Sequence, residues 1–189
     1  IALGTTGMLP ALVILDKNGK VIRNSIQQSD ARTGKQIKQL FNYKIQKWFV
    51  KKTKCGVNQQ LIAPKLLWLK QNEKSNFKKI HTVCGSYDFI NFKLTGKYSI
   101  EHNWALESGL MDFKMKKFTS DLVKLGSIKL SMLPKIFSSD QILGNISEKL
   151  AKELSLRNNV KVIAGCADHV VSAFSAGIKK SGDVLLKFG

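Results

Sequence analysis

The sequence predicts an α/β domain with one buried core. The clearest signal is near the C-terminus, where the apolar, β-branched run 160–165 is typical of a buried strand. A helix of small residues follows at 168–176, and residues 183–188 again have a strand-like composition. A hydrophobic fraction of 43% with 8% aromatic residues over 189 residues is enough for one ordinary core.

The N-terminal segment predicts a small antiparallel unit. We expect two short strands, at 1–3 and 11–15, on either side of a bend at residues 4–7. Asn18-Gly19 is a strong hairpin-turn signal, so a return strand should begin at Val21. The small residues 4–7 could expose N–H groups to a phosphate, but they lack the Walker pattern and its lysine. A tight bend without a ligand is the simpler interpretation.

Helices are expected through the middle of the chain. Apolar residues recur at spacings of three and four from Ile37 to Trp48, which predicts one amphipathic helix. Pro64 opens a second helix, in which Lys65 shows no local mark of function. Further helices are predicted at 87–94 and 118–125, and Ser147 is expected to cap another.

The net charge of +18 raises the question of an anionic partner. Nearly all of the basic residues are lysines spread along the chain, and arginine occurs only at positions 23, 32 and 157. Because base readout and bidentate phosphate contacts favour arginine, we expect no specific nucleic-acid binding. A non-catalytic module that uses its basic surface on an anionic partner stays open as the alternative function.

Cysteine and histidine usage indicates neither disulfides nor a metal site. The three cysteines and three histidines show no C-x-x-C or H-x-H spacing. No apolar run of about 18 residues is present and the first residues do not resemble a signal peptide, so we expect a cytoplasmic protein without a membrane partner. Since the chain opens at Ile1 instead of a methionine, we also expect further sequence upstream.

The sharpest candidate for chemistry is Asp168, within Gly165-Cys166-Ala167-Asp168-His169. It lies where a buried strand gives way to a helix, and open α/β sheets bind ligands beyond the carboxyl ends of their strands. The helix dipole favours an ionised acid, which can accept a proton from a substrate hydroxyl during phosphoryl transfer. The alternative, which the local sequence favours, is that Asp168 is only a helix N-cap.

Several segments in order resemble the FGGY carbohydrate kinases, especially xylulokinase-like members, over almost the whole chain. Residues 1–16 resemble the segment G-Q-M-H-G followed by an apolar strand, and 30–33 resemble W-N-D-x-R-T. The further matches are 61–73 with the A-P-K-L-L-W helix, 87–96 with K-D-Y-L-x-x-x-L-T-G, 108–112 with S-G-x-x-D and 165–169 with G-G-G-D-N.

The resemblance implies an actin-like, ribonuclease-H-like ATPase domain: a mixed sheet with a large helical insertion, truncated at both ends. Residues 1–182 would form part of the N-terminal, sugar-binding domain, and 183–189 the first strand of the C-terminal, ATP-binding domain. ATP and Mg²⁺ are the implied cofactors, bound mainly by parts outside this chain. A homodimer of the full-length protein stays open.

The implied activity is ATP-dependent phosphorylation of a sugar hydroxyl, on a pentulose such as xylulose or ribulose or on a related polyol. Asp168 would be the general base that deprotonates the attacking hydroxyl. Met8, Leu9 and Pro10 would lie in the loop that touches the sugar, with His169 beside it. Gly189 would begin the phosphate-binding G-T-S loop. We expect this chain by itself to be inactive.

Three departures from the family pattern concern specificity. Leu9 and Pro10 stand in the region of the family's Met-His pair, and Gln28 replaces the tryptophan before Asp-x-Arg. His169 stands where xylulokinases have asparagine. The sequence therefore leaves the identity of the sugar open.

Overall fold

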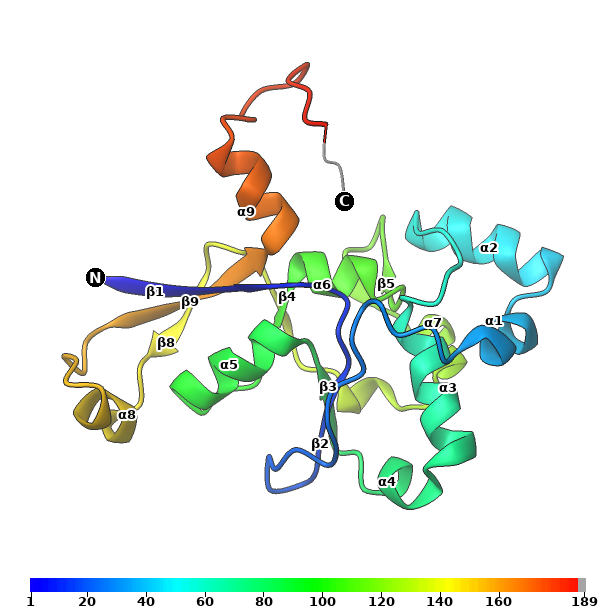
Figure 1. Cartoon of the computed structure of the whole chain (residues 1–189), viewed down its shortest axis with the longest axis horizontal. Coiled ribbons are helices and arrows are strands. Elements are labelled where there is room, and N and C mark those ends of the chain that lie inside the picture. The colour runs from blue at the N-terminus through cyan, green and yellow to red at the C-terminus, as the bar shows by residue number, and fades with distance from the viewer. Residues whose placement is uncertain (187–189) are drawn as a thin grey trace.

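The computed structural model describes residues 1–186 and contains a three-stranded mixed sheet (Figure 1). The strand order is β1 (Ala2–Gly7), β9 (Lys161–Ala167) and β8 (Ile142–Asn145). The middle strand, β9, runs parallel to β1 and antiparallel to β8. Segment 8–141, much of it helical, is thus inserted between β1 and the other two strands. The predicted mixed sheet with a large helical insertion is confirmed.

Strand β1 continues straight through residues 4–7, so the predicted bend there is wrong. The parallel ladder with β9 extends to the pair Gly7 and Ala167, with a register shift between Gly4 and Thr6. Opposite this shift Gly165 has φ +79°, and an added Cβ would lie 2.0 Å from the Thr5 carbonyl oxygen. The glycines allow two strands to approach closely instead of turning the chain.

Helix α5 (Ser86–Thr95) packs against both β1 and β9. Its Asn91 accepts a hydrogen bond from Thr5 Oγ1 at 2.9 Å and donates from Nδ2 to the Ala164 carbonyl oxygen at 2.8 Å. One buried amide thus ties the helix to both parallel strands. The helix ends at Gly96, which is left-handed with φ +72°.

The predicted hairpin turn at Asn18-Gly19 is present. The Gly19 N–H donates to the Asp16 carbonyl oxygen at 3.0 Å. The return strand is reduced to a bridge between Leu15 and Val21. The main partner of β2 (Val13–Leu15) is instead β3 (Thr82–Cys84), which runs antiparallel to it. The main apolar core forms beside this pair.

The helical segment that was predicted as one unit from Ile37 to Trp48 is two helices. Asn42 accepts a hydrogen bond from the Ile45 N–H at 3.0 Å and so begins a second helix. Ser147 caps α8 (Glu148–Glu153) through the Leu150 N–H, as predicted.

The remaining elements complete the insertion and the C-terminal part. The helices are α1 (Gly34–Leu40), α2 (Tyr43–Thr53), α3 (Ile62–Asn72), α4 (Lys74–Lys78), α6 (His102–Glu107), α7 (Ser120–Leu125), α8 (Glu148–Glu153) and α9 (Asp168–Ser175), with a 3₁₀ turn at Leu130–Met132. The short strands are β4 (Ile100–Glu101), β5 (Met111–Asp112), β6 (Lys117–Phe118) and β7 (Ile136–Phe137).

The strand predicted from residue 183 does not form over 183–186. Asp183 Oδ2 accepts hydrogen bonds from the N–H groups of Lys179 and Lys180, both at 2.8 Å, and so closes a turn just before the residues expected to form the strand. The division into 1–182 and 183–189 stays a prediction. None of the helices between residues 1 and 186 is long and apolar enough to cross a membrane.

Candidate functional site

The parallel pairing of β1 and β9 brings Met8 and Asp168 to the same edge of the sheet. Gly7 and Ala167 are register partners at the ends of the two strands, so the residues that follow them leave the sheet at the same edge. This edge is the carboxyl end of both strands, where α/β sheets bind ligands. The Asp168 side chain is 41% exposed there, and α9 extends beyond it (Figure 1).

Asp168 does not act as the N-cap of α9. The N-cap position is occupied by Ala167, and no side chain caps the helix. Asp168 is the first helical residue, and its Oδ1 lies 2.6 Å from the backbone nitrogen of His169. The geometry therefore does not support the interpretation of Asp168 as only a cap, and its exposed carboxylate can contact a ligand.

His169 lies between two carboxylates. Its Nε2 is 3.3 Å from Oε1 of Glu107, the last residue of α6, and its Nδ1 is 3.6 Å from Asp168 Oδ1. Burial raises the pKa of Glu107, an effect that the nearby His169 opposes and the Asp168 carboxylate reinforces. The sequence contained no signal for Glu107, because the contact depends on how α6 meets α9.

A cavity of about 190 Å³ adjoins this row of side chains through Glu107. Its lining residues are mostly polar or small: Cys55, Gly56, Asn58, Gln60, Leu61 and Glu107. Amide and carboxylate groups can hydrogen-bond to hydroxyl groups. The cavity is therefore suited to a small, polyhydroxylated ligand.

The predicted sugar loop exposes only one of its three side chains. Met8 is 54% exposed, whereas Leu9 is 2% exposed and Pro10 is buried. A contact from Leu9 to a ligand would therefore come from its backbone. The Met8 carbonyl oxygen itself accepts a hydrogen bond from Ser86 Oγ at 3.3 Å.

Two buried side chains hold the rest of this loop. Lys65 Nζ donates to the Pro10 carbonyl oxygen at 3.0 Å, and Trp104 Nε1 donates to the Ala11 carbonyl oxygen at 2.9 Å. Lys65 also bonds the Gln27 carbonyl oxygen at 2.9 Å, and burial lowers its pKa to about 8. Sequence reasoning missed this lysine, although its place on the apolar side of a helix was an available signal.

A buried carboxylate network lies beneath the site. Glu101 accepts hydrogen bonds at 2.8 Å from Tyr87 Oη, from Asn103 Nδ2 and from Ser139 Oγ. Asn103 Nδ2 also lies 3.4 Å from the sulfur of Cys166 in β9. The network thus fixes the end of the strand that carries Asp168.

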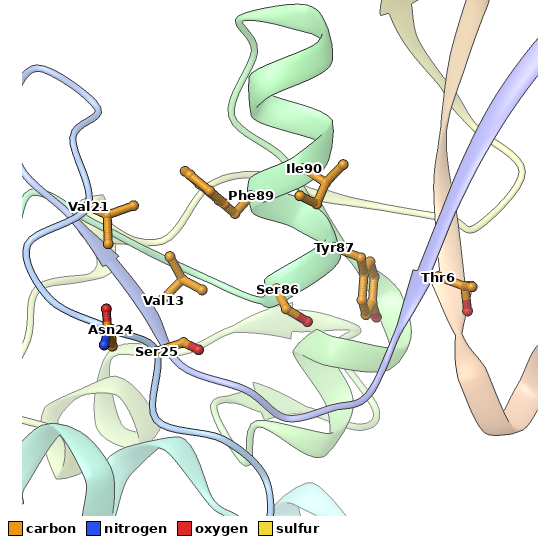
Figure 2. A pocket seen from close by; sticks show the side chains of 9 residues that line it. All are labelled: Thr6, Val13, Val21, Asn24, Ser25, Ser86, Tyr87, Phe89 and Ile90. Atoms are coloured by element: carbon orange, nitrogen blue, oxygen red, sulfur yellow. The ribbon is translucent and has the colours of Figure 1, made fainter.

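A second cavity, of about 450 Å³, lies between the hairpin and the start of α5 (Figure 2). Val13, Val21, Phe89 and Ile90 give it a largely apolar lining. Its only acidic or basic side chain is the Tyr87 phenol, whose pKa is raised by burial. Among the described residues that line it, none is an aspartate, glutamate, histidine, lysine or arginine.

Two further points concern nucleotide binding and metal binding. Gly189, predicted to bind the nucleotide, lies outside the described residues. Among residues 1–186, no group of three or more His, Cys, Asp or Glu side chains could hold a metal ion.

The mixed sheet with a helical insertion and the acid after its central strand match the arrangement that the resemblance implied, an actin-like ATPase domain of the sugar-kinase type. The sequence model of the FGGY family of carbohydrate kinases, N-terminal domain, matches residues 1–175. The chain belongs to this family, and the predicted resemblance is confirmed.

Relatives of the chain include xylulose kinases from Bacillus subtilis (strain 168) and Staphylococcus xylosus. The first is 30% identical over 184 residues, and the second is 28% identical over 184 residues. In each case the match covers 97% of this chain but only 37% and 38% of the relative, respectively. The chain thus spans well under half the length of these enzymes.

Solved structures of xylulose kinases have a similar fold over most of this chain. The crystal structure of xylulose kinase from Rhodospirillum rubrum has a TM-score of 0.94 and 44% identity, over 97% of this chain and 38% of that one. The ligand-bound xylulose kinase from Lactobacillus acidophilus has a TM-score of 0.87 at 24% identity, and covers 93% of this chain and 36% of its own. The predicted fold class is confirmed.

Proposed function

We propose that the protein to which this chain belongs transfers the γ-phosphoryl group of ATP to a hydroxyl of a pentulose, such as xylulose or ribulose, or of a related polyol. The observation that carries this proposal is the half-exposed carboxylate of Asp168, at the same carboxyl edge of the β1–β9 pair as Met8. Family membership and the relatives named xylulose kinases support it.

Asp168 acts as the general base in this proposal. Its carboxylate accepts the proton of the sugar hydroxyl as the oxygen of that hydroxyl forms a bond to phosphorus. Asp168 is the first residue of α9, and its side chain is 41% exposed, so a sugar hydroxyl can reach its carboxylate. Met8 and His169 flank the carboxylate and contact the sugar, and the backbone of Leu9 and Pro10 holds the loop in place.

ATP, bound with Mg²⁺, would supply the phosphoryl group and neutralise the charge of its phosphates. The described side chains around Asp168 do not fit that role. Glu107, His169 and Asp168 form a row rich in acceptors, and no lysine or arginine lines the adjoining 190 Å³ cavity. This part of the site suits a hydroxyl donor, so we assign it no phosphate contact. Gly189 as the start of a phosphate loop remains a proposal.

The test is substitution of Asp168 by asparagine in the full-length protein, assayed with ATP and a panel of ketoses and polyols. We expect phosphoryl transfer to fall by about 10²-fold to 10⁴-fold while sugar binding persists. Asp121→Asn, whose side chain in α7 is 46% exposed, is the matched control and should retain activity. Retained transfer in D168N would remove Asp168 from the role of base.

A second assay addresses the chain by itself. We expect the isolated 189-residue chain to transfer no phosphate to any sugar of the panel. Turnover of ATP by this chain with any ketose would show that it contains a phosphate-binding site of its own.

A further inference from the structure

The cavity of about 190 Å³ next to Glu107 has room for more of a substrate than the hydroxyl that faces Asp168. Glu107 ends α6 and lines this cavity, and its Oε1 also lies 3.3 Å from Nε2 of His169. On the other side of the same ring, Nδ1 lies 3.6 Å from Asp168 Oδ1. The carboxylates of Asp168 and Glu107 are therefore separated by one imidazole ring and two contacts. A short polyhydroxylated chain can span this gap, whereas a single hydroxyl group cannot.

Gln60 lines the same cavity and comes two residues before α3. The residue is half-buried, and its backbone N–H donates to Asn58 Oδ1 at 2.8 Å. Its side-chain amide forms no hydrogen bond among residues 1–186. Because an amide has both donors and an acceptor, it can bind a hydroxyl group in either direction. The Gln60 amide is thus available to a ligand in the cavity.

The other polar side chains of the cavity wall are occupied within the protein. Asn58 accepts the hydrogen bond from Gln60, and its Nδ2 lies 3.5 Å from the Gly56 carbonyl oxygen. Cys55 Sγ lies 3.2 Å from the Leu106 carbonyl oxygen, and burial raises the pKa of this thiol. Among the described lining residues, the polar side chains that remain for a ligand are therefore those of Gln60 and Glu107.

These two side chains complement a pair of adjacent hydroxyl groups. An ionised carboxylate only accepts hydrogen bonds, so one hydroxyl can donate to Glu107. The neighbouring hydroxyl can exchange a hydrogen bond with the Gln60 amide. A carboxylate or phosphate group at this end of a substrate would instead meet Glu107 as a like charge. The cavity therefore favours an uncharged, hydroxyl-bearing end of a substrate.

We propose that Glu107 and Gln60 form a second subsite for the sugar, in which they bind two adjacent hydroxyls remote from the one that Asp168 deprotonates. The inference rests on the proposed function and narrows its substrate class. The substrate is a neutral ketose or polyol whose chain continues beyond the reacting end with adjacent hydroxyl groups. Glu107 and Gln60 bind this chain and take no part in proton transfer.

The first test measures sugar binding to the full-length protein without ATP, by isothermal titration calorimetry. We expect Glu107→Ala to raise the Kd of the sugar that binds most tightly by about tenfold to 100-fold, because a charge-assisted hydrogen bond is lost. Gln60→Ala should raise it by about threefold to tenfold. Gln59→Ala is the matched control, since Gln59 is exposed and does not line the cavity. Thermal unfolding checks that the variants are folded, and an unchanged Kd in folded E107A or Q60A would overturn the proposal.

A matched ligand shows which end of the sugar the subsite contacts. The ligand is the same sugar without its terminal hydroxyl, at the end that is not phosphorylated. The wild-type protein should bind this deoxy sugar about tenfold more weakly than the parent sugar. The double variant of Glu107→Ala and Gln60→Ala should distinguish the two ligands by less than about twofold. Equal discrimination by the wild-type protein and the double variant would overturn the proposal.

The charge of Glu107 provides a separate readout. An aldonate of the same length should bind the wild-type protein at least about tenfold more weakly than the neutral sugar. Glu107→Gln keeps an acceptor oxygen but removes the charge, so it should reduce this difference by about fivefold or more. An equal difference in the wild-type protein and E107Q would contradict a contact between Glu107 and the remote end of the sugar.

The outcomes separate this inference from the proposed function, because calorimetry requires no phosphoryl transfer. An inactive D168N, together with a sugar affinity that is independent of Glu107 and Gln60, would leave the proposed function standing and remove only the subsite. Sugar binding that depends on both residues, without transfer from ATP to any sugar, would keep the subsite and remove the proposed function. Failure of the full-length protein to bind any neutral ketose or polyol would overturn both.

Discussion

Lys65 Nζ lies 3.0 Å from the carbonyl oxygen of Pro10, and the lysine side chain is fully buried. Its second acceptor is the Gln27 carbonyl oxygen at 2.9 Å. A buried ammonium bound by two carbonyl oxygens ties α3 to the predicted sugar loop and to the segment before Asp30. Burial disfavours the charged ammonium and so lowers the pKa of Lys65 to about 8.

Lys65 makes the stability of the fold depend on pH. Between pH values of about 8 and 10.5, the unfolded lysine binds a proton that the folded lysine has lost. The free energy of unfolding should therefore rise with pH across this window, by about 1.4 kcal/mol per pH unit relative to Lys65→Met. Urea denaturation of both proteins over this pH range measures the difference. Parallel pH profiles for the chain and K65M would contradict it.

Asp88 should give the opposite slope. It accepts hydrogen bonds from the Gly85 and Glu101 backbone N–H groups, yet burial raises its pKa to about 8. The folded carboxyl then holds a proton that the unfolded one releases above its ordinary pKa of about 4. The free energy of unfolding should fall as pH rises through this window, relative to Asp88→Asn. A flat difference between the two denaturation series would show that Asp88 is ionised in the fold.

Gly165 is a position in β9 that the backbone of β1 approaches closely. Gly165→Ala should destabilise the chain by several kcal/mol, because its φ is +79° and the new Cβ would meet the Thr5 carbonyl oxygen at 2.0 Å. Gly34→Ala is the matched control, since nothing lies within 4 Å of its added Cβ. Chemical denaturation of both variants measures the contrast. Equal stabilities would mean that the parallel strands can separate at this point.

Several local features of this fold were predictable from sequence, whereas the pairing of distant strands was not. The Asn18-Gly19 turn, the Ser147 cap and the passage from β9 to α9 depend on neighbouring residues, and all three are present. The bend at 4–7 was wrong because its glycines serve a pairing with a strand at the other end of the chain. Secondary structure periodicity contains no information on that pairing.

The same distinction applies to the site. Asp168 was identified because a carboxylate after a buried strand is visible in the sequence and fits a family motif. Lys65 and Glu107 were missed because their roles come from contacts with Pro10 and His169, which belong to other elements. Sequence motifs therefore indicated the proposed base, whereas these contacts between different elements required the structure.

Met8 and Leu9 are adjacent, yet they should respond to substitution in opposite ways. Leu9 is 2% exposed and belongs to the main core, so Leu9→Ala should lower the free energy of unfolding by about 2–5 kcal/mol. Met8 is 54% exposed, so Met8→Ala should change that free energy by less than about 0.5 kcal/mol. Chemical denaturation of the 189-residue chain tests this pair directly.

In the full-length enzyme, Met8 should matter for sugar binding although it matters little for stability. Met8→Ala removes a side chain that we propose contacts the sugar, so it should raise KM for the sugar while the protein stays as stable as before. Met8→Leu keeps the apolar volume and should restore most of the affinity. Steady-state kinetics with the preferred sugar of the panel measures both variants. If M8A left KM and kcat unchanged, the Met8 side chain would not contact the sugar. Any contact of residues 8–10 with the sugar would then come from their backbone.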